Sequence, residues 1–405
     1  MTHAPSKSRL DPLKDYAFRR LRELLAPIQP RSNRAPIMLS VGEPQNQPPA
    51  FMAEEMARNA DKWNRYTDHA GTPEFRQAVA AWLKRRYRLP DGMVNPDKHI
   101  LPVPGSREGL FMAALFAVPE SKAGRKPAAL MPNPAYHVYT GAAIIAGAEP
   151  VYLPARKENG FLPDLDAIPK AELDRAAIFY LCTPANPQGS VASLDYLKRA
   201  IELARRHDFL LVVDECYADI YDKVPPSGAL EACAALGGSL DHVVVAHSLS
   251  KRSSAPGLRS GFVCGSAESI LAYVNVLNFG AAGMNQPMLA AATRLWSDEA
   301  HVESNRAIYR RNFDLAERVL DGRFGYYRPA GGFYLWLDVG DGAEAAKKLW
   351  SEAGIRVLPG GFMAWPDGSR QAHAQPYIRV AMVYDEPMME TAMKLMTQVL
   401  ANGKA

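Results

Sequence analysis

Short apolar runs alternate along this chain with longer segments in which apolar residues recur every three or four positions. The first pattern is typical of strands buried on both faces of a sheet, and the second of amphipathic helices. The predicted strands in the first two thirds of the chain are 37–41, 128–131, 150–153, 177–181, 210–214 and 243–246, with a further strand ending near Val103. The predicted helices are 14–26, 50–62, 73–88, 106–117, 136–146, 194–206, 287–296 and 301–321.

Strands that alternate with helices at this spacing indicate an α/β fold with a mostly parallel sheet covered by helices on both faces. The last eighty residues have a separate pattern, with strands at 332–339, 355–358 and 377–383 and helices at 343–353 and 387–401. We therefore predict three parts. They are an arm with part of a small domain (1–47), a large domain (48–296) and a smaller C-terminal α/β domain (297–405).

Composition narrows the class of protein. The 405 residues are 48% hydrophobic and carry a net charge of +4 without a long run of Lys or Arg, which argues against nucleic acid or a membrane as a partner. The four cysteines show no metal-binding spacing, so we expect no metal site and free thiols in a reducing compartment. No apolar leader or membrane-spanning stretch is recognisable, and we expect a cytoplasmic protein.

Lys251 is the first candidate for chemistry, because it lies just beyond a predicted strand, where open α/β sheets place their ligands. Its amine could form a Schiff base, while the hydroxyls of Ser248 and Ser250 and the guanidinium of Arg259 hold a phosphate. Two other interpretations exist. A lysine after a strand is usually a solvated charge, and Ser248 to Lys251 matches the S-x-x-K motif of penicillin-binding proteins. The S-D-N and K-T-G strings that the second interpretation needs do not occur.

The remaining groups that pyridoxal 5'-phosphate needs follow other predicted strands. Asp214 could keep the pyridine nitrogen protonated, Asn186 and Tyr217 could donate to the phenolic oxygen, and Tyr136 could stack on the ring. Ser106 and Arg107 begin a predicted helix, whose free N–H groups suit a phosphate. Neither the P-loop nor the G-x-G-x-x-G string is present, which argues against a nucleotide site.

In this combination the chain resembles the class I and II aminotransferases of fold type I over nearly its whole length. The strings that carry the resemblance are Tyr66-x4-Gly71-x-Pro73-Glu74-x-Arg76, Gly105-Ser106-Arg107-Glu108-Gly109, Asn133-Pro134-x-Tyr136, Asn186-Pro187-x-Gly189, Asp214-Glu215-x-Tyr217, Ser248-x-Ser250-Lys251 and Tyr377-Ile378-Arg379-Val380.

The resemblance implies a homodimer with its active sites at the subunit interface. In that arrangement Tyr66 reaches the cofactor phosphate of the neighbouring subunit. Arg379 binds the α-carboxylate of an amino acid or 2-oxo acid, and the backbone of Gly42 meets the same carboxylate. Lys251, Asp214 and Tyr217 are the expected catalytic residues.

Within the class, the run from Ser250 to Val263 most resembles succinyldiaminopimelate aminotransferases. The expected reaction is ping-pong transfer from glutamate to a keto acid, N-succinyl-2-amino-6-oxopimelate, in lysine and diaminopimelate biosynthesis. The segments 279–286 and 374–376 depart from that subgroup. Three arginines, Arg34, Arg252 and Arg328, are available to bind the distal end of the substrate.

The sequence also allows other functions. The chain could be an aminotransferase for aromatic, methionine, alanine or aspartate-type substrates, or a C–S β-lyase. A transcription regulator with an aminotransferase-like body would need a DNA-binding domain ahead of the fold, and only about forty residues precede Gly42.

Overall fold

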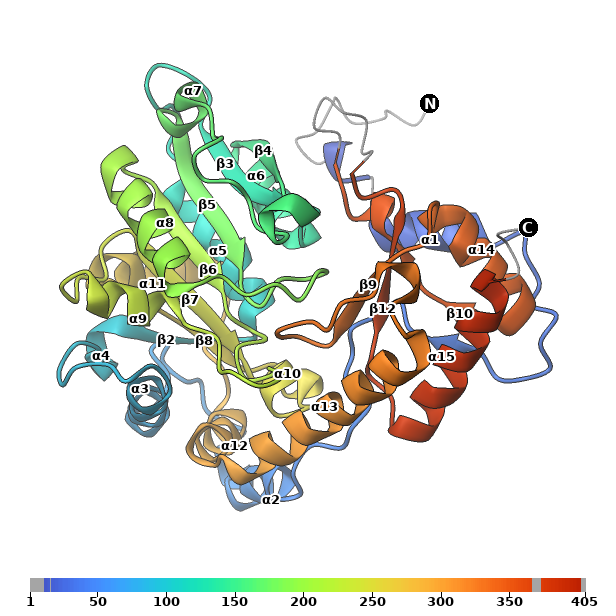
Figure 1. The fold of residues 1–405 in the computed structure, drawn as a ribbon. Coiled ribbons are helices and arrows are strands. Elements are labelled where there is room, and N and C mark those ends of the chain that lie inside the picture. Colours follow the sequence, from blue (N-terminus) through green and yellow to red (C-terminus); the bar gives the residue numbers. More distant parts are fainter. Residues whose placement is uncertain (1–10, 15, 366–372, 402–405) are drawn as a thin grey trace, which may run out of the picture.

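A seven-stranded sheet forms the centre of the larger part of the computed structural model, which describes residues 11–14, 16–365 and 373–401 (Figure 1). The strand order is β2–β8–β7–β6–β5–β3–β4, and β8 runs antiparallel to the other six strands. The strands are Ile100–Val103 (β2), Ala128–Asn133 (β3), Glu149–Pro154 (β4), Ala176–Cys182 (β5), Leu210–Asp214 (β6), Val243–Ser248 (β7) and Gly261–Gly265 (β8).

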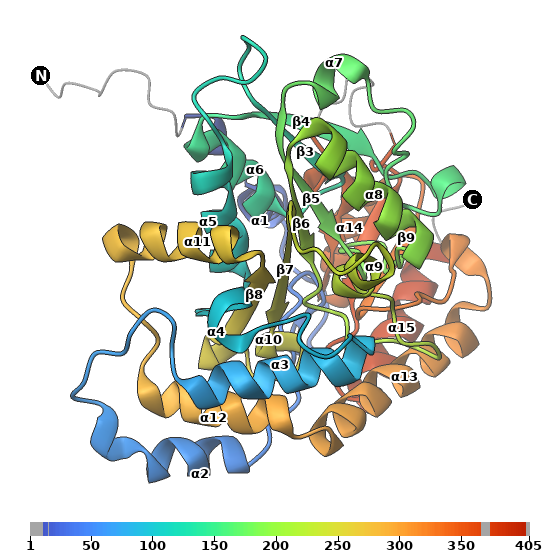
Figure 2. The same cartoon turned by 90° about the vertical axis from the view of Figure 1, so that its left-hand side faces the viewer.

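Helices cover both faces of this sheet (Figure 2). One face is covered by Pro73–Tyr87 (α3), Leu194–His207 (α8), Ala229–Ala235 (α9) and Gln286–Ser297 (α12), the other by Ser106–Ala117 (α5), His137–Ala146 (α6) and Ala267–Gly280 (α11). Side chains alternate between the two cores along each strand, so Val243 and Val245 face one core, and Val244 and Ala246 the other. The short helices are Phe51–Arg58 (α2), Pro96–His99 (α4), Lys170–Leu173 (α7) and Leu249–Arg252 (α10).

A smaller part lies beside the sheet and contains both ends of the described chain (Figure 1). Its strands Tyr334–Asp338 (β9), Leu358–Pro359 (β11) and Tyr377–Ala381 (β12) form an antiparallel sheet, and Ile37–Met38 (β1) pairs with Ile355–Arg356 (β10). Its helices are Ala17–Leu25 (α1), Gly342–Ala353 (α14) and Glu386–Ala401 (α15). The long helix Ala300–Leu320 (α13) runs from the large part into the small one. The boundaries at residues 47 and 296 stay predictions.

The parallel direction of the strands determines at which edge of the sheet a ligand site is expected. The carboxyl ends of parallel strands lie at one edge of a sheet, where ligands bind. Here Asn133, Cys182, Asp214 and Ser248 end β3, β5, β6 and β7. Because β8 is antiparallel, its first residue, Gly261, lies at the same edge.

The predicted α/β fold is confirmed, but the sequence pattern does not predict β8 or α11. Strand β8 has five residues, two of them glycine. Helix α11 buries Ile270, Tyr273 and Leu277 at helical spacing, but its opposite side exposes the apolar Leu271 and Phe279, which obscures the period. Predicted strands also shorten: 37–41 becomes β1, and 355–358 divides into β10 and β11.

Within the described ranges, no helix has the length and apolar character needed to cross a membrane. The first ten residues of the predicted N-terminal arm lie outside the described residues.

Candidate active site

A cavity of about 530 Å³ lies at the carboxyl edge of the sheet, between the large and small parts. Of the residues predicted from sequence to form the site, all except Tyr66 line it. They are Gly42, Ser106, Arg107, Tyr136, Asn186, Asp214, Tyr217, Ser248, Ser250, Lys251, Arg259 and Arg379.

Lys251 reaches this cavity from α10, the single helical turn that follows β7. Its amine donates a hydrogen bond to the backbone carbonyl of Gly42. Burial lowers the pKa of Lys251 to about 8, and the positive charges of Arg379 and Arg107 act in the same direction. About a tenth of this amine is therefore neutral and nucleophilic at pH 7, far more than for a lysine with the ordinary pKa.

Asp214 is buried at the end of β6, on the floor of the cavity. The hydroxyl of Tyr139 donates to its Oδ2 at 2.8 Å, and the backbone N–H of Cys216 donates to its Oδ1 at 3.2 Å. Burial raises the pKa of Asp214, and these hydrogen bonds oppose the rise. A positively charged group placed against this carboxyl would restore its ionised form, which suits a protonated ring nitrogen.

Arg379 comes from β12 of the small part, and its guanidinium is almost fully buried. It donates to Oδ1 of Asn186 at 2.8 Å and to the carbonyl of Ser40 at 2.6 Å. Its Nε is buried and makes no hydrogen bond among the described residues. A buried guanidinium with an unpaired donor is suited to an anionic ligand such as a carboxylate.

Two tyrosine hydroxyls, those of Tyr217 and Tyr334, lie 3.2 Å apart in the wall next to Lys251. Burial raises the pKa of both phenols, so each stays protonated and can act as a donor. Because Asn186 accepts from Arg379 through its oxygen, its amide nitrogen remains available as a second donor in this wall.

The opposite end of the cavity is built to receive an anion. Helix α5 begins there, directly after Gly105, whose φ of 104° requires glycine and whose added Cβ would lie 2.7 Å from Arg259. The hydroxyls of Ser248 and Ser250 lie 2.9 Å apart in the same wall. Arg259 donates to both carboxylate oxygens of Glu108 at 2.9 Å, so part of its charge is already paired.

Pyridoxal phosphate fits this arrangement of donors. Helix α10 supplies the lysine, β6 supplies the carboxyl group, and α5 supplies the anion-binding end. All three meet around one cavity. Arg107 and Tyr136 line the same cavity, and Nε of Arg107 donates to the Tyr136 hydroxyl at 2.8 Å. The predicted stacking role of Tyr136 stays a prediction.

Tyr66 lies outside the cavity and exposes 96% of its side chain. The three arginines considered for the distal end of the substrate do not line it either. Arg252 is buried against Asp219 and Glu299, Arg328 pairs with Asp222, Asp314 and Glu317, and Arg34 is exposed. Sequence position alone does not distinguish the ion-paired Arg252 and Arg328 from ligand-binding arginines.

Some residues in the cavity wall or directly behind it are not predicted from the sequence. Tyr139 and Tyr334 contact predicted site residues from α6 and β9, and only tertiary structure brings them there. The cavity is also lined by five further aromatic side chains, those of Tyr16, Phe18, His137, Phe362 and Trp365. Burial, with the charges of Arg107 and Arg379, lowers the pKa of His137 to about 4, so this imidazole is neutral at neutral pH.

Comparisons with known proteins identify the family. Residues 34–395 match the family model for class I and II aminotransferases. The chain is 32% identical to an LL-diaminopimelate aminotransferase of Dehalococcoides mccartyi over 392 residues, or 94% of this chain and 95% of the relative. A crystal structure of an aminotransferase from Neisseria meningitidis is similar, with a TM-score of 0.92 and 36% identity over 98% of this chain and 100% of that one.

A probable N-succinyldiaminopimelate aminotransferase from Thermus thermophilus is also similar, with a TM-score of 0.80 and 26% identity over 97% of this chain and 100% of that one. The resemblance inferred from the sequence motifs is therefore confirmed. The chain belongs to the class I and II aminotransferases and is a pyridoxal phosphate-dependent enzyme.

Proposed function

We propose that Lys251 holds the cofactor covalently and, once released from it, moves the proton of the amino acid during transfer. The observation that carries this proposal is a lysine amine of lowered pKa inside the cavity formed by Asp214, Arg379 and the start of α5. When bound, pyridoxal phosphate withdraws electrons from the carbon that bears the transferred amino group.

The other cavity residues have separate tasks. Asp214 holds the ring nitrogen in its protonated form, and Asn186 and Tyr217 donate to the phenolic oxygen. Tyr136 packs on the ring face. The phosphate is held by Ser106, Arg107, Ser248, Ser250 and Arg259, with the N–H groups at the start of α5.

Arg379 binds the substrate carboxylate, with the backbone of Gly42 beside it. Its two contacts, to Asn186 and Ser40, fix the guanidinium plane before substrate arrives, so little side-chain entropy is lost on binding. This preorganisation applies equally to the amino acid and to the 2-oxo acid, as ping-pong transfer through one site requires.

For substrates we propose glutamate as donor and N-succinyl-2-amino-6-oxopimelate as acceptor, in lysine and diaminopimelate biosynthesis. The support is the motif from Ser250 to Val263 and the names of the diaminopimelate and N-succinyldiaminopimelate aminotransferases to which the chain is similar. A second candidate is an aromatic amino acid, favoured by the aromatic side chains Tyr16, Phe18, Phe362 and Trp365 along the cavity.

We also propose a cytoplasmic homodimer with shared sites. Tyr66 and Phe279 expose 96% and 97% of their side chains, and Leu271 and Trp63 expose more than half of theirs. Such side chains on α11 and the segment before α3 suit burial against a second copy, from which Tyr66 would reach the neighbouring cavity. The cytoplasmic location is supported by the four cysteines, none of which is in a disulfide.

The test is the visible absorption spectrum of the holoenzyme with glutamate alone. Loss of the band of the lysine-bound cofactor, with formation of 2-oxoglutarate, is expected. The reaction should then reverse with N-succinyl-2-amino-6-oxopimelate, and an aromatic 2-oxo acid serves as the comparison. Pyruvate and ammonia from cystathionine would instead identify a β-lyase. A holoenzyme that lacks the lysine-bound band in the wild type, or keeps it in Lys251→Ala, would contradict the role of Lys251.

A further inference from the structure

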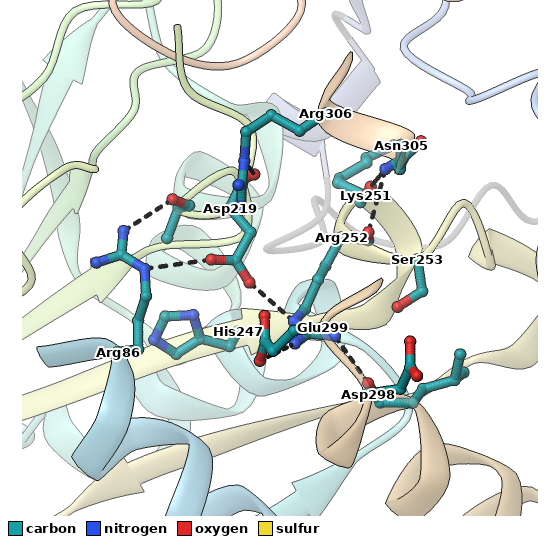
Figure 3. Close-up of polar contacts among 12 residues, drawn as sticks. Arg86, Asp219, His247, Lys251, Arg252, Ser253, Asp298, Glu299, Asn305 and Arg306 are labelled. Atoms are coloured by element: carbon teal, nitrogen blue, oxygen red, sulfur yellow. Dashed lines mark hydrogen bonds and ion pairs between the residues drawn. The ribbon is translucent and has the colours of Figure 1, made fainter. Parts of the chain in front are cut away.

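The main chain that carries Lys251 is held from outside the cavity by one side chain of α13. Helix α10 has four residues, too few to be stable alone, and its last carbonyls lack helical partners. The amide nitrogen of Asn305 donates to the carbonyls of Lys251 at 3.0 Å and Arg252 at 3.1 Å (Figure 3). Its oxygen accepts from the Ser254 hydroxyl at 3.0 Å, so this buried carboxamide is dedicated to residues 251–254.

Arg252, the next residue, is anchored on the other side of the turn. It is 3% exposed, and its Nε lies 2.8 Å from Oδ2 of Asp219 (Figure 3). Its two terminal nitrogens donate to Glu299 at 2.8 Å and to the carbonyl of Leu295 at 2.7 Å. A guanidinium paired in three directions has little freedom to rotate, so the backbone of its neighbour is constrained as well.

Asp219 connects this anchor to the other catalytic segment. It follows Asp214 and Tyr217 on the same loop, and its carboxylate also pairs with Arg86 at 3.2 Å. Its backbone carbonyl accepts from Arg306 at 2.8 Å. Burial alone would raise the pKa of Asp219, but Arg252, Arg86 and Arg306 lower it below its usual value, so the carboxylate stays charged.

We propose that Asn305, Arg252 and Asp219 are positioning residues that fix the Lys251 amine relative to Asp214 and Tyr217. None of the three lines the cavity, so they act only through the backbone of the residues that do. The inference rests on the proposed role of Lys251 and adds to it a rigid link between the strand-end segments after β6 and β7. Misplacing a reacting group by about 1 Å can cost about a hundred-fold in rate.

The test uses two variants. Asn305→Ala removes all three hydrogen bonds between Asn305 and residues 251–254 without leaving a buried charge. Arg252→Lys keeps the positive charge but cannot pair in three directions at once. The matched control is Arg175→Gln. Arg175 is also a buried arginine, paired with Glu149 and Glu172, but it lies at the start of β5 away from the cavity.

Three quantities are measured for each variant. They are the rate at which the apoprotein captures pyridoxal phosphate on its lysine, the values of kcat and KM for glutamate, and the melting temperature. We expect Asn305→Ala and Arg252→Lys to slow capture and lower kcat by about ten-fold or more, with KM changed less than about two-fold. Arg175→Gln should lower the melting temperature alone.

If Asn305→Ala and Arg252→Lys both keep the wild-type capture rate and kcat, the positioning role is overturned while the role of Lys251 stays intact. Equal losses of kcat in Arg175→Gln, or failure of both variants to fold, would show a general structural role and also overturn it. Absence of lysine-bound cofactor in the wild type would instead remove the proposed function on which the inference rests.

Discussion

The hydroxyl of Tyr139 lies 2.8 Å from Oδ2 of Asp214 and is the one side-chain hydroxyl among the described residues that donates to this carboxyl. It reaches Asp214 from α6 through the buried face of the sheet, stacked 4.7 Å from the ring of Tyr180. The donated hydrogen bond opposes the effect of burial on the pKa of Asp214. The acid that we place under the cofactor nitrogen therefore depends on a residue outside the cavity wall.

We expect Tyr139→Phe to raise the pKa of Asp214 further and to weaken cofactor binding. A hydrogen bond to a charged group contributes about 1.5–3 kcal/mol, which corresponds to roughly ten- to hundred-fold in the dissociation constant of pyridoxal phosphate. Titration of the apoprotein with pyridoxal phosphate measures this dissociation constant. The control is Tyr180→Phe, which loses a hydrogen bond to the carbonyl of Leu110 instead. Equal dissociation constants for the two variants would contradict the role of Tyr139.

The lowered pKa of Lys251 predicts how cofactor capture depends on pH. Below pH 8 the amine is mostly protonated and has no free electron pair, and above pH 8 it is mostly neutral. Capture of pyridoxal phosphate by the apoprotein should therefore accelerate as pH rises through about 8 and then level off. Stopped-flow absorbance across this range gives the profile. A rate that keeps rising to the ordinary lysine pKa would show that burial does not perturb this amine.

Arg379→Gln should raise KM for glutamate and for the 2-oxo acid together. Loss of one partner of a buried charge-assisted pair costs about 2–5 kcal/mol, so kcat/KM should fall by about thirty-fold or more. Steady-state kinetics with each substrate varied provides the measurement. If KM rose for only one of the two substrates, Arg379 would not bind the carboxylate group that both substrates share.

Some residues of this site can be predicted from their position in the sequence, and others cannot. Lys251, Asp214 and Asn186 follow buried strands, and parallel strands bring their carboxyl ends together, so their meeting could be predicted. Tyr139 and Tyr334 arrive from elements whose packing the sequence pattern does not specify. Arg252 and Arg379 are both buried arginines, yet Arg252 pairs with Asp219, whereas Nε of Arg379 has no hydrogen-bond partner in the part of the chain that the structure describes. Only the tertiary partners distinguish the two.

Gly42→Ala should be destabilising even though the substitution is small. A Cβ at this position would lie 1.7 Å from the Tyr334 hydroxyl, and Tyr334 is 3% exposed, so its ring must move and separate from Tyr217. Overpacking of this kind costs about 1–3 kcal/mol. Gly141→Ala is the control, because its Cβ meets no atom within 4 Å inside α6, where alanine should stabilise by up to about 1 kcal/mol. Opposite shifts in melting temperature are expected, and a neutral Gly42→Ala would contradict the steric argument.

The exposed Tyr66 provides a test of shared active sites. If Tyr66 completes the site of a second copy, Tyr66→Ala and Lys251→Ala subunits are each defective as homodimers, because both of their sites lack one residue. A mixed dimer has one site in which Lys251 of the first subunit and Tyr66 of the second are both intact. Unfolding and refolding the two variants together should therefore recover up to about a quarter of wild-type activity, since about half of randomly paired dimers are mixed and each has one intact site. Light scattering on the wild type gives the subunit number. The other outcome is a dimeric wild type whose refolded mixture is no more active than the two variants measured separately. That result would mean that Tyr66 acts within its own chain or has no role in the site.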